Sequence, residues 1–334
     1  MTSYELVKNA IEFQNPERLP FWQHDDADTP DDVLDIWEMD RAEAGWFFDN
    51  PGPDDWGCIW EATDVKNMGQ VTRHPLTDWS SLHDFKPPNP RNPYYFDRIE
   101  SELVQANGRY VVVTSHFNLI ERLHMLRGFE KTMMDFYLAP DKVEAVLDMI
   151  LEHKIELFRE LHRRFGNAVH GLFLTDDWGT QQGTFISGET FEQFFQERYK
   201  IFFKEVHDLG YHAILHSCGR VNNFVPYFID MGADVLNMQQ PRAYGIEDIG
   251  KQFAGKVCFL TTVDIQSTLP DGDEEKVREE AALLVKHWAT SAGGFIVFNY
   301  GDAEALNIRP EMSGIMFSAF RSMIKEGRIE NSSL

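Results

Sequence analysis

The fold is decided by short apolar stretches such as residues 171–177, which read Gly-Leu-Phe-Leu-Thr-Asp-Asp and end in two acids. Comparable runs occupy residues 19–22, 110–114, 212–215, 234–237, 257–261 and 295–299. They are rich in β-branched and aromatic residues and are bounded by glycine or polar residues, a pattern typical of parallel strands buried on both faces.

Amphipathic stretches separate these runs, and residues 140–165, 188–209 and 273–290 are predicted to be helices. Pro140 stands near the first position of the first stretch and Gly166 follows its end, as start and stop signals do. Strands and helices that alternate through short links form right-handed βαβ units. In a chain of 334 residues they predict an α/β fold of the (β/α)8 TIM-barrel class. The first strand is not followed by a Gly-x-Gly-x-x-Gly motif, which argues against a dinucleotide-binding fold.

Residues 24–100 do not fit this alternation and are rich in Pro, Asp and Trp, as in Asp54-Asp55-Trp56-Gly57. We expect a long N-terminal insertion after the first strand. It is either a lid or substrate wall, or an ordered surface loop that covers one end of the barrel. Residues 101–330 carry the regular part of the barrel, and residues 1–334 are expected to form one domain.

The composition narrows the class of partner. The net charge of −23 repels nucleic acid and anionic membrane surfaces, so we expect neither as a partner. No apolar run approaches the roughly 20 residues that span a bilayer, and residues 1–15 lack the pattern of a signal peptide. Three cysteines, Cys58, Cys218 and Cys258, do not suggest a disulfide framework. These features predict a soluble, cytoplasmic protein that acts on a small molecule.

Metal-binding side chains follow the predicted strand 212–215. Because alternate side chains of an extended segment point the same way, His216 and Cys218 can bind one metal ion, and an imidazole with a thiolate favours zinc. The alternative is a buried cysteine beside a hydrogen-bonded histidine. We predict Asp302 as the third ligand, with Asp177 and Glu121 as further carboxylate candidates. Cys258 is expected in the core, and Cys58 reaches the site only if the insertion folds over it.

Other polar residues follow the strands at the face of the barrel where active sites are found. Asp176, Asp177 and His116 are predicted to be catalytic, since neighbouring carboxylates can divide into a proton donor and an ionised base. The alternative is that one aspartate caps a helix. The predicted substrate-binding residues, which supply apolar walls, amides and a cation, are His24, Trp56, Trp60, Asn118, Arg122, Trp178, Gln181, Gln239 and Tyr300. For each tryptophan taken singly, ordinary packing is the favoured alternative, and Arg122 can equally be tied to Glu121 or Asp177.

Several of these segments resemble the uroporphyrinogen-decarboxylase superfamily. The motifs are Thr-Asp-Asp-Trp-Gly-Thr-Gln at 175–181, Leu-His-Ser-Cys-Gly at 215–219, Gly-Ala-Asp-Val-Leu-Asn at 232–237 with Gln-Gln-Pro at 239–241, Thr-Val-Asp at 262–264 with Thr-Leu-Pro at 268–270, and Gly-Gly-Phe-Ile at 293–296. The resemblance covers residues 100–330 well and the N-terminal third poorly. It implies a (β/α)8 fold.

Two activities are known in the superfamily. True uroporphyrinogen decarboxylases carry an arginine-rich N-terminal segment that binds substrate carboxylates, whereas residues 20–26 here read Pro-Phe-Trp-Gln-His-Asp-Asp. The methylcobamide:thiol methyltransferases and related corrinoid-dependent demethylases use a zinc site of His-x-Cys with a distant cysteine. His216 and Cys218 match the first half, but the distant cysteine is absent from residues 298–302, Phe-Asn-Tyr-Gly-Asp.

The resemblance therefore implies a zinc-dependent methyltransferase or demethylase. Its methyl partner would be a methylcobamide on a separate corrinoid protein, because this sequence has no Asp-x-His-x-x-Gly corrinoid-binding signature. The substrate would be a small thiol, ether or amine. The first alternative is a decarboxylase of a smaller carboxylated substrate that uses Asp176, Asp177 and His116 without a metal. The second is a binding protein for a methylated or amine ligand.

Overall fold

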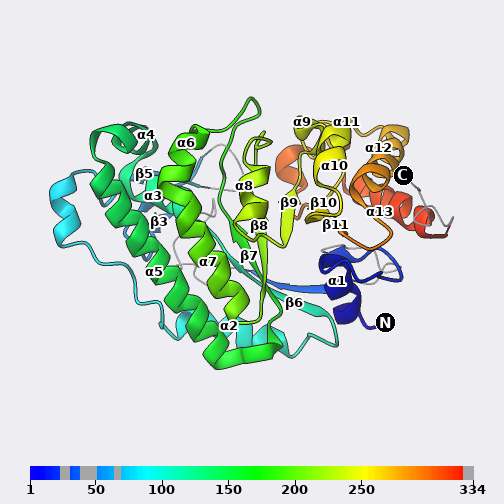
Figure 1. Cartoon of the computed structure of the whole chain (residues 1–334), viewed down its shortest axis with the longest axis horizontal. Helices are drawn as coiled ribbons and strands as arrows, with labels where there is room; N and C mark the ends of the chain where they lie inside the picture. Colours follow the sequence, from blue (N-terminus) through cyan, green and yellow to red (C-terminus); the bar gives the residue numbers. More distant parts are fainter. Residues whose placement is uncertain (23–30, 38–50, 64–68, 326–334) are drawn as a thin grey trace.

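Eight parallel strands form the centre of the molecule, in the order β1-β11-β10-β9-β8-β7-β6-β2 (Figure 1). The computed structural model describes residues 1–22, 31–37, 51–63 and 69–325. The barrel strands are β1 (Phe21–Trp22), β2 (Val33–Ile36), β6 (Tyr110–Ser115), β7 (Gly171–Thr175), β8 (His212–His216), β9 (Val235–Met238), β10 (Cys258–Thr261) and β11 (Phe295–Phe298). Most of their residues are buried, as expected of parallel strands covered by helices.

The ends of this strand order, β1 and β2, lie side by side and nearly close the barrel. We call the line between them the seam. Asp32, fully buried, joins its two sides: its backbone N–H donates to the Phe21 carbonyl (2.9 Å), and its carboxylate accepts from the Phe21 N–H (3.0 Å) and from the Arg18 guanidinium (2.7 Å to each oxygen). The predicted (β/α)8 class is confirmed.

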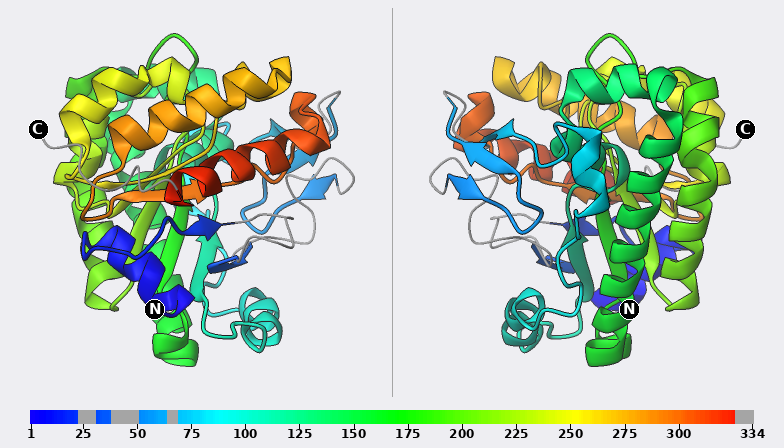
Figure 2. Two further views of the ribbon diagram at one scale, coloured as in Figure 1. Left: turned by 90° about the vertical axis from the view of Figure 1, so that its right-hand side faces the viewer. Right: turned by 90° about the vertical axis from the view of Figure 1, so that its left-hand side faces the viewer.

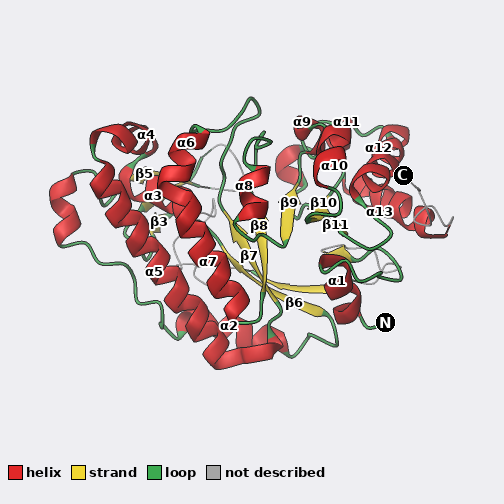
Figure 3. Cartoon of the chain, in the orientation of Figure 1, coloured by secondary structure: helices red, strands yellow, loops and turns green. Residues whose placement is uncertain are grey.

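Helices surround the strands on the flanks (Figure 3). The α-helices are α1 (Ser3–Ile11), α2 (Tyr94–Leu103), α3 (Leu119–Arg127), α4 (Phe129–Leu138), α5 (Pro140–Phe165), α6 (Gly188–Phe191), α7 (Glu197–Asp208), α8 (Val225–Asp230), α9 (Pro241–Tyr244), α10 (Ile246–Phe253), α11 (Thr268–Asp271), α12 (Glu274–Trp288) and α13 (Pro310–Lys325). Shorter helical turns are η1 (Trp79–His83), η2 (Gly166–Ala168), η3 (Glu192–Gln196) and η4 (Glu304–Leu306). Within the described residues, none of the helices has the length and apolar character needed to cross a bilayer.

The three helices expected from the sequence are present. Helix α5 has the predicted bounds, with Pro140 at its start and Gly166 after its end. Residues 188–208 form α6, η3 and α7 in succession, and η3 is a π-helical turn. Asp273 caps α12 because its side chain accepts from the N–H groups of Glu275 and Lys276.

The region between residues 24 and 100 differs in part from the prediction. It contains β2, a barrel strand that the sequence pattern does not predict, and a small antiparallel sheet of β3 (Gly52–Pro53), β4 (Ile59–Glu61) and β5 (Gln70–Arg73). Figure 2 shows this sheet, in light blue, beside the barrel wall. The insertion proper therefore follows the second strand of the barrel.

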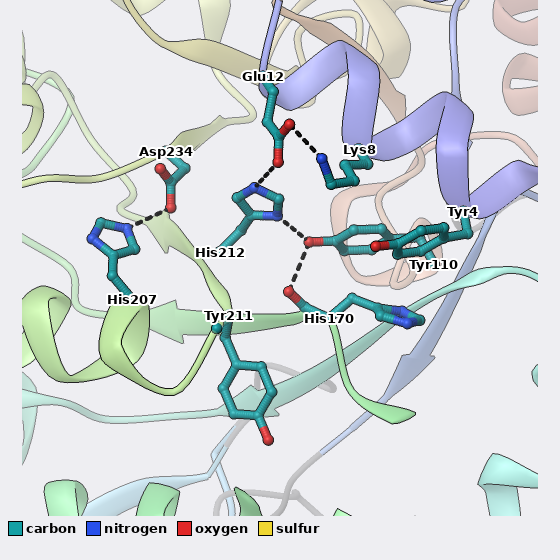
Figure 4. Close-up of a pocket in the computed structure, with 10 residues that line it drawn as sticks. Tyr4, Lys8, Glu12, Tyr110, His170, His207, Tyr211, His212 and Asp234 are labelled. Atoms are coloured by element: carbon teal, nitrogen blue, oxygen red, sulfur yellow. Dashed lines mark hydrogen bonds and ion pairs between the residues drawn. The ribbon is translucent and has the colours of Figure 1, made fainter. Parts of the chain in front are cut away.

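Helix α1 packs against the end of the barrel where the strands begin. A cavity of about 370 Å³ lies there, lined by Tyr4, Lys8, Glu12, Tyr110, His170, His207, Gly210, Tyr211, His212 and Asp234 (Figure 4).

The polar groups of this cavity are bonded to one another. The buried Tyr110 hydroxyl donates to the His170 carbonyl (2.9 Å) and lies 2.5 Å from His212 Nδ1. On the other side of its ring, His212 Nε2 lies 3.3 Å from Glu12 Oε1, and Glu12 also pairs with Lys8 of α1. This network ties the first helix to the strands at the end of the barrel opposite the predicted site.

Candidate functional site

Three metal-binding side chains meet where β7 and β8 end. Asp177, His216 and Cys218 each offer a ligand atom, and these atoms all lie within 4.8 Å of one another. His216 Nε2 is 3.3 Å from Cys218 Sγ and 3.6 Å from Asp177 Oδ1. The structure thus brings together the pair expected from the sequence and adds Asp177, one of the further candidates. Among the described residues, Asp302 belongs to no such group.

The backbone holds this group, called here the Asp177–His216–Cys218 group, in place. The Cys218 N–H donates to Asp177 Oδ1 (2.7 Å), which joins the loops after β7 and β8. Gly219 has a φ of +84°, and a Cβ there would lie 2.3 Å from the Gly179 carbonyl oxygen. Only glycine allows the two loops to approach this closely.

Two acidic side chains, Asp177 and Glu121, lie near the Cys218 thiol. Burial raises the pKa of the Cys218 thiol well above its usual value, and the carboxylates of Asp177 and Glu121 raise it further. Glu121, at the start of α3, has its own pKa raised by burial and by the nearby Asp177 and Asp176. In the absence of a metal these effects favour the neutral thiol. A divalent cation would favour the thiolate instead, because it stabilises a coordinated sulfur anion.

Asp176 faces a different way from its neighbour Asp177. It is fully buried, and its carboxylate accepts from the N–H groups of Ile120 (3.0 Å) and Glu121 (2.8 Å) at the start of α3 and from the Tyr199 hydroxyl. Burial raises the pKa of Asp176 to about 7. Asp176 therefore caps a helix from the preceding βα unit, and its position gives no support to the predicted catalytic role.

His116 and Glu121 share a neighbour, the hydroxyl group of Thr175. The Thr175 hydroxyl is 3.4 Å from His116 Nδ1 and 3.3 Å from Glu121 Oε2. The next residue, Phe117, has a φ of +55°, which is unusual for a bulky side chain and signals local strain at the strand end. His116 and Glu121 thus lie on either side of the Thr175 hydroxyl at the end of β7.

Arg122 is paired with a residue that the sequence does not suggest. Its Nη1 donates to Asp54 Oδ2 (3.0 Å), and the two side chains are only 5% and 9% exposed. The guanidinium also lies over the rings of Trp56 (5.1 Å) and Phe117 (5.4 Å). The charge of Arg122 is thus paired in the interior, and this arrangement gives no support to the predicted contact with a substrate carboxylate.

The tryptophans predicted as substrate walls are packing residues in this structure. Trp178 is fully buried among Phe191, Phe195, Tyr199 and Phe224. Trp56 and Trp60 are each 3% exposed. The Trp56 ring packs on His153 and the Trp60 ring on Phe117.

The remaining predicted residues that the structure describes form hydrogen bonds or packing contacts within the protein. Asn118 is fully buried and donates to the carbonyls of Ser115 and Thr175. Gln181 donates to Gln240, and Tyr300 packs against the core. His24 lies outside the described residues.

The other two cysteines belong to no metal-binding group in the part of the chain that the structure describes. Cys258 is fully buried in the core at the start of β10, as expected. Cys58 is also fully buried, and its thiol donates to the Met125 carbonyl (3.3 Å). Cys218 is the only one of the three that belongs to a metal-binding group among the described residues.

Asn237 ends the motif at residues 232–237 but is not among the site residues predicted from the sequence. Its Oδ1 lies 2.7 Å from His216 Nδ1, and Gln239, predicted to bind substrate, donates to the same oxygen (2.8 Å). The detectable signal is an amide inside the apolar run Val-Leu-Asn-Met at 235–238.

A barrel of eight parallel strands with imidazole, thiol and carboxylate gathered at the strand ends defines an enzyme architecture with a candidate metal centre. The family model of uroporphyrinogen decarboxylase (URO-D) matches residues 55–323, and the chain belongs to this family. The match begins further towards the N-terminus than the motifs in the sequence suggest.

Solved structures with a similar fold include a methyltransferase from Methanosarcina mazei. It has 16% sequence identity and a TM-score of 0.63, over 96% of this chain and 85% of that chain. Xylanase 10B from Thermotoga maritima is more distant, with 11% identity and a TM-score of 0.42 over 75% of this chain and 85% of that chain. A D-psicose 3-epimerase has 12% identity and a TM-score of 0.39 over 67% and 83%. A sequence search of curated proteins finds no match.

Proposed function

We propose that this protein is a zinc-dependent methyltransferase or demethylase that acts with a separate corrinoid protein. The observation that carries the proposal is the Asp177–His216–Cys218 group, which offers one carboxylate oxygen, one imidazole nitrogen and one sulfur. This donor set suits zinc, and three protein ligands leave the fourth position of a catalytic zinc site open. The third ligand in this proposal is Asp177 in place of Asp302, because Asp177 is the carboxylate grouped with His216 and Cys218 among the described residues.

Zinc bound there would supply Lewis acidity to the substrate heteroatom. The substrate would be a small thiol, ether or amine, and the methyl group would pass between its heteroatom and a methylcobamide on the partner protein. His116 and Glu121 both lie beside the Thr175 hydroxyl, and Glu121 is close enough to Asp177 for that carboxylate to raise its pKa. They are the groups of this chain that would accept or return the proton of the heteroatom. The likeness in fold to a methanogen methyltransferase agrees with this assignment.

Decarboxylation of a carboxylated substrate has less support. Such a substrate needs a cation, and the one predicted for it, Arg122, is buried in an ion pair with Asp54. The Asp177 carboxylate would also repel an anionic substrate.

Metal analysis of the purified protein tests the proposal. We expect one zinc per chain in the wild type, loss of zinc in His216→Ala and Cys218→Ala, and no loss in Cys258→Ala, a matched control that removes a buried thiol elsewhere in the barrel. With free methylcobalamin as methyl donor and small thiols as acceptors, the first two variants should lose methyl transfer and the control should keep it. Wild-type protein without stoichiometric zinc would overturn the proposal.

A further inference from the structure

The position of Asn237 follows from the register of three neighbouring strands. His216 of β8 is the register partner of Asn237 of β9, and Asn237 is in turn the partner of Leu260 of β10. Residues paired in register lie at one level of the barrel. The Asn237 side chain is 1% exposed, so its hydrogen bonds are made inside the protein.

The orientation of the Asn237 amide is determined by its partners. Its Nδ2 donates to the Leu260 carbonyl (3.0 Å), which can only accept. The other amide atom, Oδ1, therefore faces His216 Nδ1 at 2.7 Å and also accepts from Gln239 Nε2 at 2.8 Å. If the amide were flipped, its oxygen would face the Leu260 carbonyl oxygen, and its NH2 group would face the NH2 group of Gln239.

The same argument locates the proton on His216. Because Asn237 Oδ1 cannot donate, His216 Nδ1 must carry the hydrogen of this bond. In the neutral ring, Nε2 then has a lone pair. That atom faces Cys218 Sγ (3.3 Å) and Asp177 Oδ1 (3.6 Å).

We infer that Asn237 is a positioning residue that keeps His216 in the tautomer able to bind a metal ion through Nε2. A hydrogen bond from the other ring nitrogen commonly fixes the tautomer and orientation of a histidine ligand. Gln239 supports the arrangement from the same strand end because it holds Oδ1 in place. The inference deepens the proposed function and depends on it only for the metal; the tautomer is a property of the metal-free protein.

The first test needs no metal. Long-range ¹H–¹⁵N correlation spectra of protein labelled at histidine report which ring nitrogen is protonated, and His216→Ala assigns the signal. In metal-free wild type we expect the hydrogen on Nδ1. In Asn237→Ala we expect a mixture of tautomers, and in Asn237→Asp, which keeps an acceptor, the wild-type pattern. A proton on Nε2 of His216 in the wild type would overturn the inference without any substitution.

The second test measures zinc affinity by competition with a chelator. Asn237→Ala should bind zinc about 10–100-fold more weakly, and Asn237→Asp should recover most of the loss. Gln240→Ala is a matched control, since Gln240 is a buried amide nearby that bonds to Gln181 instead. Equal affinity of Asn237→Ala and wild type would contradict the inference. If the wild type binds no zinc but the tautomer still depends on Asn237, the proposed function fails and the inference stands.

Discussion

Replacing Asp54 with alanine should destabilise the protein far more than the loss of a surface charge. Asp54 accepts four hydrogen bonds: from the N–H groups of Trp56 (3.0 Å) and Cys58 (2.8 Å), from Trp60 Nε1 (3.0 Å) and from Arg122 Nη1 (3.0 Å). The variant leaves a guanidinium that is only 5% exposed without its carboxylate. Breaking a buried ion pair from one side costs about 3–5 kcal/mol.

The companion variants separate the charge from the other contacts. Arg122→Met removes the cation, and the double variant with Asp54→Ala leaves neither charge buried. Apolar replacement of a whole buried pair is often close to neutral, so the double variant should be less destabilised than the sum of the single ones, with a coupling of about 1–3 kcal/mol.

Urea unfolding of the four proteins, followed by tryptophan fluorescence and circular dichroism, measures this cycle. Arg98→Ala is the control, because Arg98 is 57% exposed and pairs with Glu102 one turn away; it should cost no more than about 0.5 kcal/mol. A cost below about 1 kcal/mol for Asp54→Ala, or strict additivity in the double variant, would show that the pair is not a buried ion pair in solution.

Three further changes have defined outcomes. Gly219→Ala should cost about 1–3 kcal/mol from backbone strain alone, with a further clash against Gly179, and should lower metal content; unchanged thermal stability would contradict this. Tyr110→Phe removes a buried hydroxyl that makes two hydrogen bonds and should lower the free energy of unfolding by about 1–2 kcal/mol in urea titrations. The hydrogen bond that His207 donates to the Asp234 carboxylate raises the pKa of His207 above 6.5, so this pair stabilises the fold most at lower pH and loses its effect as the pH rises through the folded-state pKa. The stability difference between wild type and His207→Gln should therefore shrink as the pH rises above about 6.5, and a difference that grows with pH would refute the assignment.

Much of the fold can be predicted because its signals are local. Helix α5 has the expected bounds since Pro140 and Gly166 mark its two ends. Strand β2 is missed because its four residues, Val-Leu-Asp-Ile, contain an acid and stand in a region rich in Pro and Asp. Its identity as a barrel strand depends on pairing with β6, which lies far along the chain.

The candidate site also contains residues that local sequence signals predict and residues whose contacts depend on distant parts of the chain. His216 and Cys218 can be found from spacing alone, because residues two apart on an extended segment share a side. Asp177 and Asn237 join them from neighbouring strands, so their contacts depend on register between strands. The partner of Arg122 could not be predicted, since Asp54 is 68 residues away in the insertion.

The seam also has a consequence for how this molecule comes apart. Elsewhere the barrel wall is a ladder of main-chain bonds between paired strands, whereas among the described residues β1 and β2 are joined by contacts that include the Asp32 carboxylate and one adjacent main-chain bond. Because β1 and β2 are the two ends of the strand order and are not paired with each other in the described part of the chain, we expect the barrel to open first along the seam. Amide hydrogens of Phe21 and Asp32 should exchange with solvent before those of β7 and β8 in the opposite wall.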